Sequence, residues 1–223
     1  MSVGTRTPLS AEEAIDAIHE AYVKIFNRSP VAHMLAILVS QTALETGQWR
    51  AIYDYNFGNI RGRYKGSTMS ILGANEIIDG KTVIVEDNFR SYPDMYAGAE
   101  DFVRFLGTDT TPHNGRANKW DMAFEAAERG DLKAYVFALA DPDGNPRTSD
   151  GYFTASKDLY FKGIKALYNQ FLPMCVDFLG SSTDTDPAEL VPSLNAGNVG
   201  ELASALERVA LELSRIADGL KDD

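Results

Sequence analysis

The stretch from residue 31 to residue 44 is apolar on nearly all sides, and this constrains the fold more than any other part of the chain. A helix without a polar face has to be surrounded by other elements. The stretch therefore predicts a central, buried helix that ends near Gly47. Its apolar side chains are Val31, Met34, Leu35, Ile37, Leu38 and Val39.

Helical patterns on both sides of this stretch supply the elements that would surround it. A capping box at residues 10–13 opens a helix, and apolar side chains follow at helical spacing up to a break at residues 27–30. Further helices are expected at residues 96–106, 120–128, 132–139 and 155–171, and Leu172-Pro173 is expected to end the last one.

A strand pattern interrupts the helices between residues 77 and 89, with Asp79-Gly80 as a type I′ turn between two strands. The predicted fold class is therefore α+β and mainly α-helical, with a small β-hairpin lobe and a further helix near the C-terminus.

Composition excludes several classes of function. The 223 residues carry a formal net charge of −11, which makes the chain a poor candidate for binding nucleic acid or anionic lipid. Cys175 is the only cysteine, so an intrachain disulfide and a cysteine-built zinc site are excluded. We see no metal motif, expect no cofactor, and find no apolar run of the roughly 18 residues that a membrane span needs.

The chain is expected to divide into a body, residues 1–178, a linker, residues 179–199, and an amphipathic helix, residues 200–223. The linker is rich in Ser, Thr, Asp and Pro. The last segment either folds back on the body or serves as an oligomerisation or docking helix, and the linker favours the second interpretation. Its apolar side chains have a/d spacing: Leu202, Leu206, Val209, Leu213, Ile216 and Leu220.

Glu45 is the first candidate for catalysis. It lies at the last turn of the apolar helix, where burial and the helix dipole both disfavour a charged carboxylate and so raise its pKa. A general acid that works near neutral pH needs such a pKa. The alternative is an exposed glutamate paired with Arg50, Arg61 or Arg63, and the environment alone leaves both open.

Aromatic and polar side chains alternate in residues 49–64. Flat rings beside amides and other polar groups suit a carbohydrate groove, although the same rings could form a small core. Phe57 is more typical of a core. The candidate substrate contacts here are Trp49, Tyr53, Asn56, Asn59 and Arg61.

Carboxylates also gather around the hairpin, and glycoside hydrolysis generally uses two carboxyl groups across a cleft. Asp79 is explained by the turn, and Glu86 and Asp87 by solvation of a strand end. Glu76, at the start of the hairpin, is best placed to face Glu45. Tyr152 could contact a sugar, whereas helical spacing favours a core position for Tyr160.

Four blocks, in order, resemble the glucosaminidase domain of peptidoglycan hydrolases, glycoside hydrolase family 73, which has a lysozyme-like fold. Residues 43–47 look like its Ala-Leu-Glu-Ser-Gly box, and residues 56–62 resemble its Asn-Leu-Phe-Gly-Ile-Lys block. Residues 76–92 are similar to its hairpin, which ends in Phe-Arg-x-Tyr. Residues 151–160 resemble its Gly-Tyr-Ala-Thr-Asp-Pro-x-Tyr-Ala block, with Ala155-Ser156 in place of Asp-Pro.

The resemblance, which covers about residues 11–172, implies cleavage of the β-1,4 bond after N-acetylglucosamine in peptidoglycan glycan strands. Glu45 would be the general acid, and Glu76 either the base for water or the group that stabilises a substrate acetamido nucleophile. Tyr152 would be the active-site tyrosine, and Tyr92 and Tyr160 would contact substrate.

Three alternatives remain at this stage. A lytic transglycosylase on the same fold uses one glutamate, which would make Glu76 dispensable, and a muramidase would cleave the other glycosidic bond. A non-catalytic module would only bind glycan or build an assembly.

The first residues lack the basic and then apolar layout of a signal peptide. Peptidoglycan lies outside the cytoplasmic membrane, so we expect a phage lysin or virion component that reaches the cell wall from the host cytoplasm or from the particle. Residues 200–223 would then mediate a homo-oligomer or contact a phage structural protein.

Overall fold

The computed structural model describes residues 2–78, 81–108, 119–142, 151–153 and 156–181, with side chains described outside residues 2 and 70–87. The chain divides into two units, Met1–Leu179 and Gly180–Asp223. All described elements belong to the first unit, except for the last two residues of the last helix. They are β1 (Ser2–Val3), α1 (Ala11–Phe26), α2 (Ala32–Glu45), β2 (Thr68–Ile78), β3 (Lys81–Arg90), α3 (Met95–Gly107), α4 (Asp121–Glu128), α5 (Leu132–Ala140) and α6 (Lys157–Ser181).

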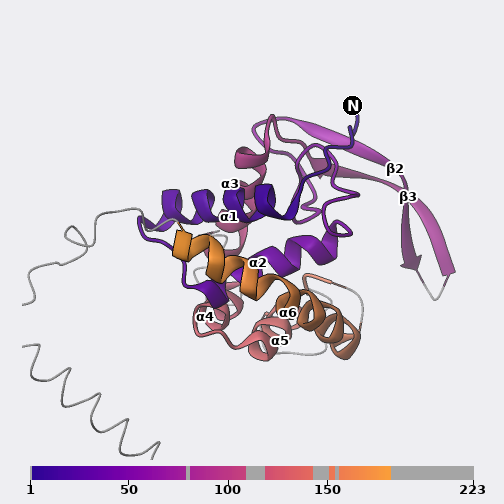
Figure 1. Cartoon of the computed structure of the whole chain (residues 1–223). Helices are drawn as coiled ribbons and strands as arrows, with labels where there is room; N and C mark the ends of the chain where they lie inside the picture. Colours follow the sequence, from indigo (N-terminus) through magenta and orange to yellow (C-terminus); the bar gives the residue numbers. More distant parts are fainter. Residues whose placement is uncertain (1, 79–80, 109–118, 143–150, 154–155, 182–223) are drawn as a thin grey trace, which may run out of the picture. The chain divides into compact units, whose positions relative to one another are not determined.

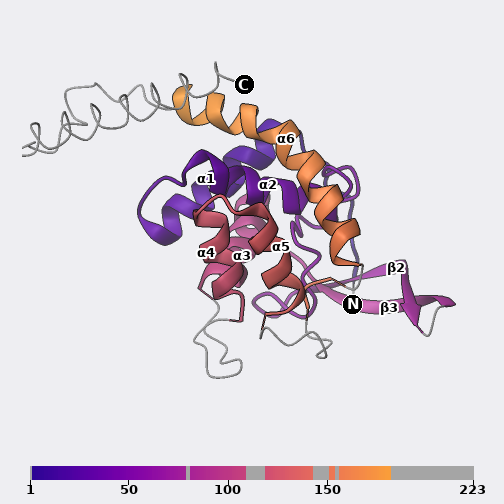
Figure 2. The ribbon, with the colours of Figure 1, turned by 90° about the horizontal axis from the view of Figure 1, so that it is seen from below.

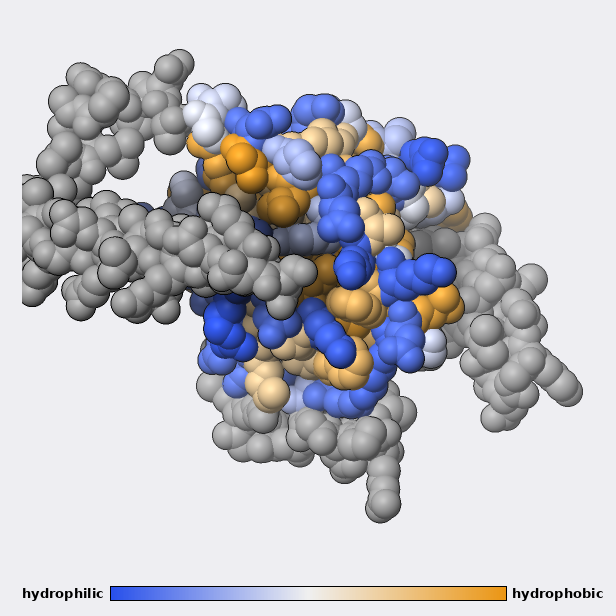
Figure 3. Space-filling model, turned by 60° about the horizontal axis from the view of Figure 1, so that its bottom comes forward, coloured by the Kyte–Doolittle hydropathy of each residue, from blue (hydrophilic) through white to orange (hydrophobic). Residues whose placement is uncertain are grey.

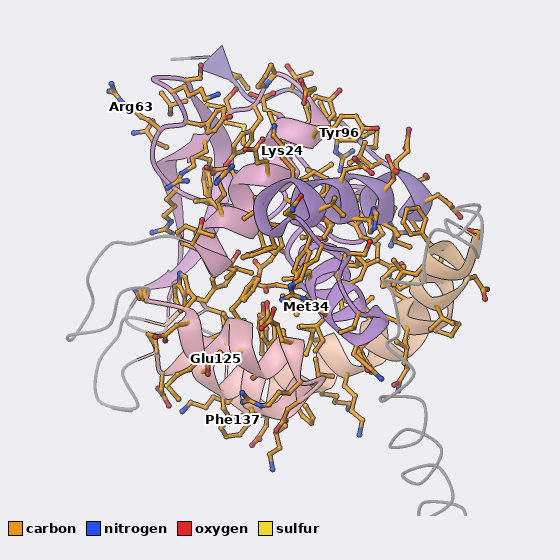
Figure 4. All side chains as sticks on the ribbon, turned by 90° about the vertical axis from the view of Figure 1, so that its left-hand side faces the viewer. Lys24, Met34, Arg63, Tyr96, Glu125 and Phe137 are labelled. Carbon is orange, nitrogen blue, oxygen red and sulfur yellow. The ribbon has the colours of Figure 1, made fainter. Side chains whose placement is uncertain are left out.

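Helix α2 is the central helix, as the sequence predicts. Every side chain from Met34 to Ala43 is buried, and α1, α4 and α6 lie around it (Figures 1 and 2). Met34 points into the middle of the helical body, whereas Phe137 of α5 points away from it (Figure 4). Because this part of α2 is surrounded, a polar side chain between Met34 and Ala43 needs a partner inside the protein.

The first helix begins and ends as predicted. The Ser10 hydroxyl accepts a hydrogen bond from the Glu13 amide, and the Glu13 carboxylate accepts one from the Ser10 amide, so the capping box is formed. The helix ends at Asn27, which has a left-handed backbone with φ of 53°. Lys24 then pairs with Glu100 of α3 at 2.6 Å, and this contact links the two helices.

Strands β2 and β3 form the predicted hairpin, which extends away from the helices (Figure 1). Its strands are longer than the pattern indicates, because a shift of register between Ile71 and Ala74 breaks the apolar alternation near the base. Met69 and Phe89 lie opposite each other at that base and are buried. The expected turn, Asp79-Gly80, lies outside the described residues. The α+β, mainly helical fold class is confirmed.

Helix α6 corrects one expectation, because it continues through Pro173 to Ser181 instead of ending there. A proline inside a helix removes one hydrogen bond and strains the preceding turn. Burial of Phe171 before it and Cys175 after it offsets that cost. Residues 179–181 of the expected linker are thus helical, and the rest of the linker and residues 200–223 lie outside the described residues.

The N-terminal segment forms an element that the sequence did not predict. Strand β1 pairs in parallel with Met69 and Ser70 of β2. The residues after it hold the loop at residues 52–55: the Thr5 amide donates to the Asp54 carboxylate at 2.7 Å, and the Tyr55 amide donates to the Thr7 hydroxyl at 2.9 Å. The N-terminal segment is therefore hydrogen-bonded to the loop at residues 52–55.

The surface shows no large apolar face in the view of Figure 3, where hydrophobic side chains lie between hydrophilic ones. Single exposed apolar side chains of this kind are normal for a protein surface. In the described part of the chain, no helix combines the length and the apolar character that crossing a bilayer requires.

Candidate active site

Glu45 is the last residue of α2, and a tyrosine binds its partly buried carboxyl group. The Tyr160 hydroxyl, from the start of α6, donates a hydrogen bond to Glu45 Oε1 at 2.8 Å. Burial raises the pKa of Glu45 to about 7, and the hydrogen bond from Tyr160 acts in the opposite direction. The hydrogen-bond partner of the carboxyl is thus a tyrosine. Arg50, one of the arginines considered as an ion-pair partner, donates to the Gly47 carbonyl.

The chain reverses direction immediately after Glu45. Gly47, Gln48 and Trp49 all have positive φ, between 55° and 59°, a backbone region that non-glycine residues adopt at a cost. The buried Thr46 hydroxyl stabilises this turn by donating to the Thr42 carbonyl at 2.6 Å and accepting from the Trp49 amide at 3.1 Å. The turn brings the aromatic segment back against the end of α2.

The loop at residues 56–60 is tied both to Glu45 and to the hairpin. The Asn56 side-chain amide donates to the carbonyl groups of Ile60 and Arg90, each at 3.0 Å. The Asn59 side-chain amide donates to the backbone carbonyl of Glu45 at 2.6 Å. One short loop thus links the end of the central helix to the last residue of β3.

Three tyrosines surround the Glu45 carboxyl: Tyr135 from α5, Tyr152 from the segment before α6, and Tyr160. Burial first, and then the charge of Glu45, raises the pKa of each hydroxyl well above its usual value. These phenols therefore stay neutral, and among them Tyr160 donates to the Glu45 carboxylate.

Tyr152 and Tyr160 are fixed by contacts on both sides. The Tyr152 amide donates to the Leu139 carbonyl at 2.8 Å, and its hydroxyl donates to the Gly58 carbonyl, also at 2.8 Å. A Cβ on Gly58 would lie 2.6 Å from that hydroxyl oxygen, so the absence of a side chain at Gly58 permits the approach. Phe153 stacks on the Tyr160 ring with a centroid distance of 3.7 Å.

Three of the expected substrate contacts are internal in the structure. The Trp49 indole N–H donates to the Thr42 hydroxyl at 3.1 Å, and Asn56 closes its own loop. The Tyr92 hydroxyl donates to Asp101 at 2.6 Å. These side chains are at most 4% exposed, and each of these hydrogen bonds is made within the protein.

The other expected site residues lie in different settings. Tyr53 and Asn59 are half-buried, and Arg61 is exposed. Glu76 lies in β2 opposite Val83 of β3, and its side chain is outside the described residues. Tyr160, expected either in the core or at the substrate, is buried against Glu45.

Sequence reasoning missed two polar residues at this site, Gln41 and Tyr135, both of which are 0% exposed. Gln41 had a readable signal, since it lies one helical turn before Glu45 on a mostly apolar helix and thus on the same face. Tyr135 had none, because a tyrosine in an apolar helical pattern is usually a packing residue.

A separate hollow of about 390 Å³ lies at the base of the hairpin, lined by Tyr64, Lys65, Ser67, Ser91, Tyr92, Pro93 and Ala97. The rings of Tyr64 and Tyr92 are in contact there, with a centroid distance of 4.7 Å. Across the described residues, no group of His, Cys, Asp and Glu side chains is arranged to hold a metal ion.

No protein-family model matches the chain, and no curated protein matches it. Among solved structures, it is similar to a mutant of a peptidoglycan hydrolase from Sphingomonas sp. A1, with 20% identity and a TM-score of 0.49 over 75% of this chain and 99% of that one. It is also similar to the catalytic domain of the autolysin Auto from Listeria monocytogenes, with 21% identity and a TM-score of 0.46 over 77% and 90%. The glycoside hydrolase domain of FlgJ from Salmonella typhimurium shares 14% identity, with a TM-score of 0.44 over 78% and 96%. Each similarity concerns the fold.

Proposed function

We propose that this chain is a peptidoglycan hydrolase in which Glu45 is the general acid. The observation that carries the proposal is a carboxyl group whose pKa burial raises to about 7, at the end of a buried helix. Such a group is about half protonated at neutral pH, and its protonated form can give the proton to the oxygen of a leaving sugar. The Tyr160 hydroxyl fixes one carboxyl oxygen and so orients the acid.

Peptidoglycan as substrate is supported by the four sequence blocks that resemble family 73 glucosaminidases. The same resemblance makes the β-1,4 bond after N-acetylglucosamine the bond to be cleaved. Of the expected contacts, Arg61 is exposed and Tyr53 is half-buried, so both can meet a glycan.

Glu76 is our candidate for the second carboxylate. The hairpin that carries it is bonded to the loop next to Glu45, since the Arg90 amide donates to the Ile60 carbonyl and the Gly62 amide donates to the Asn88 carbonyl, each at 2.9 Å. Glu76 pairs with Val83, two residues before the end of β2 and so near the tip of the hairpin, and its assignment rests on the family resemblance. In that role it would act as base for water or stabilise a substrate acetamido group.

The test is digestion of purified peptidoglycan by the wild type, Glu45→Gln and Glu76→Gln, with product identification by mass spectrometry. Glu125→Gln is a control, because Glu125 is an exposed residue of α4. We expect reducing-end N-acetylglucosamine from the wild type and the control, and losses of at least about 100-fold in the two site variants.

Other products would revise the proposal in defined ways. Reducing-end muramic acid would mean a muramidase. Anhydro-muramic ends that persist in Glu76→Gln would mean a transglycosylase with a single glutamate. Glycan binding without cleavage by the wild type would mean a non-catalytic module.

A further inference from the structure

Two fully buried polar side chains next to Glu45 have no hydrogen-bond partner among the described residues. They are Gln41, where this holds for both the amide oxygen and the amide nitrogen, and Tyr135, where it holds for the hydroxyl. Both residues are 0% exposed. A buried polar group left without a partner costs about 1–3 kcal/mol, so two of them at one place call for an explanation.

Both side chains lie at the same place, close to the Tyr152 hydroxyl. Burial and the charge of Glu45 raise the pKa of Tyr152, the nearby Tyr135 adds to this rise, and the adjacent Gln41 amide opposes it. The Gln41 amide lies close enough to Tyr152 to lower the pKa of that hydroxyl as a hydrogen bond does, but the pair lacks full hydrogen-bond geometry, and the Tyr152 hydroxyl donates to the Gly58 carbonyl. Gln41 also shares a face of α2 with Glu45, four residues on.

The chemistry of the two side chains determines what can bind between them. An amide and a phenol each offer one or more donors and an acceptor. A ligand that satisfies both must donate and accept in a small space. It must also be small, since neither residue reaches the surface. A single water molecule has these properties, and buried waters typically make about three hydrogen bonds to such groups.

We propose that Gln41 and Tyr135 bind one buried water molecule that also hydrogen-bonds the Glu45 carboxyl, which makes both of them positioning residues for the acid. Tyr160 holds Oε1 from the side of α6, and the water holds the carboxyl from the side of α5. A carboxyl held from two sides keeps one orientation. The catalytic consequence rests on the proposed function of Glu45, but the water site itself does not.

Two nearly isosteric substitutions test the proposal, Gln41→Met and Tyr135→Phe. Each removes the polar atoms and keeps the volume. The readout is the pKa of the Glu45 carboxyl, measured by carbon-13 NMR titration and so independent of activity. A hydrogen bond from water favours the charged carboxylate, so its loss should raise that pKa by about one unit in both variants. In the described residues, the other titratable groups around Glu45 are Tyr152 and Tyr160, and both variants retain them.

Tyr22→Phe is the matched control. Tyr22 is also a 0% exposed tyrosine, but its hydroxyl bonds Glu128 at 3.0 Å, between α1 and α4. This substitution should leave the pKa of Glu45 unchanged. A crystal structure of the wild type should also show a water within hydrogen-bonding distance of Gln41, Tyr135 and Glu45.

Two results would overturn the proposal. One is that Gln41→Met and Tyr135→Phe are both more stable than the wild type and leave the pKa of Glu45 unchanged, since this is the outcome for unsatisfied groups that bind nothing. The other is a crystal structure in which Gln41 bonds Tyr135 directly. Hydrolysis that survives Glu45→Gln would instead refute the proposed function, while the NMR titration would still decide about the water.

Discussion

Glu45 combines two properties that conflict in most carboxylates, since it is partly buried and yet has no cationic partner among the groups that shift its pKa. Burial at the end of α2 disfavours its charged form, and the dipole of the helix C-terminus has the same effect. The Tyr160 hydroxyl limits the rise in pKa because it bonds the carboxylate. The balance leaves a group that exchanges its proton near neutral pH.

Tyr160→Phe should move the pH dependence of the reaction to higher pH. Without the hydroxyl the charged form of Glu45 loses a donor, so its pKa rises above the value of about 7. A general acid must be protonated to act, so the loss of kcat/KM on the alkaline side should begin about one pH unit higher. The measurement is kcat/KM on peptidoglycan fragments between pH 5 and 9.

Tyr168→Phe is the control for this series, because Tyr168 lies on the same helix but bonds His33. Its alkaline limb should coincide with that of the wild type. If Tyr160→Phe also left the limb in place, the hydroxyl would not set the pKa of the acid.

Glu45→Gln should change how stability depends on pH. The folded-state pKa of about 7 lies above the ordinary value of 4.5, so the folded protein binds more protons than the unfolded chain between these values. The contribution of Glu45 to stability is therefore full below pH 4.5 and is lost as the pH rises to about 7. At 1.4 kcal/mol per pKa unit, the loss is at most about 3.5 kcal/mol.

Urea unfolding at a series of pH values measures this effect as the difference in unfolding free energy between the wild type and Glu45→Gln. The difference should grow in favour of the variant from pH 4.5 to pH 8. A constant difference would show that the folded protein does not perturb Glu45.

At the scale of elements, the loop at residues 56–60 is hydrogen-bonded to three parts of the protein: α2, β3 and the segment that carries Tyr152. Asn59 bonds the end of α2, and Asn56 bonds the end of β3. Gly58 accepts the Tyr152 hydroxyl at its carbonyl. A shift of this loop would therefore displace the backbone of Glu45 and one of the tyrosines around its carboxyl together.

Gly58→Ala tests this arrangement. The added Cβ would lie 2.6 Å from the Tyr152 hydroxyl and 2.9 Å from the Phe102 ring, so the loop or the tyrosine has to move. Overpacking of this kind costs about 1–3 kcal/mol, and hydrolysis should fall with it. Thermal unfolding and the digestion assay measure both.

Gly180→Ala serves as the comparison, since a Cβ there meets no atom within 4 Å and the residue lies in α6. Alanine favours a helix over glycine by up to about 1 kcal/mol, so this variant should be at least as stable as the wild type. Equal stability of the two variants would mean that the contact at Gly58 is relaxed.

At the scale of the whole molecule, a mostly buried ion pair fastens the hairpin to the helical body. Asp101 of α3 accepts hydrogen bonds from the Arg90 guanidinium at 2.7 Å and from the Tyr92 hydroxyl at 2.6 Å. Asp101→Ala leaves the partly buried Arg90 cation without this partner, which should cost about 1–3 kcal/mol in unfolding free energy. The exposed pair Glu125–Arg129, at 3.8 Å, is the comparison, and Glu125→Ala should cost less than about 0.5 kcal/mol.

We further propose that the a/d pattern of residues 200–223 mediates association of the chain. Substituting Leu206 and Leu213 together by Asp should then lower the molar mass in light scattering and leave hydrolysis of soluble fragments unchanged. Glu212→Gln, away from the a/d positions, should keep the mass of the wild type. An unchanged mass in the Leu206/Leu213 variant would exclude this role.

The elements that the sequence predicted well are those specified by neighbouring residues. The buried helix, the capping box of α1 and the spans of α3, α4 and α5 depend on periodicity and end signals within a few residues. The end of α6 was missed because burial of Phe171 and Cys175 outweighs the local effect of Pro173. Strand β1 was missed because two residues carry no period, and only pairing with β2 defines them.

For the candidate site, the sequence by itself determined that an acid ends an apolar helix, because composition and helical phase place Glu45 there. The tertiary structure decided what surrounds the carboxyl. Tyr160 lies 115 positions away along the chain, and Tyr135 resembles an ordinary packing residue of a helix in the sequence. Likewise, Trp49, Asn56 and Tyr92 have the composition of a sugar-binding groove but are buried. The physical reason is that local patterns specify a helix and its buried face, whereas the neighbours of a side chain depend on how separate elements pack.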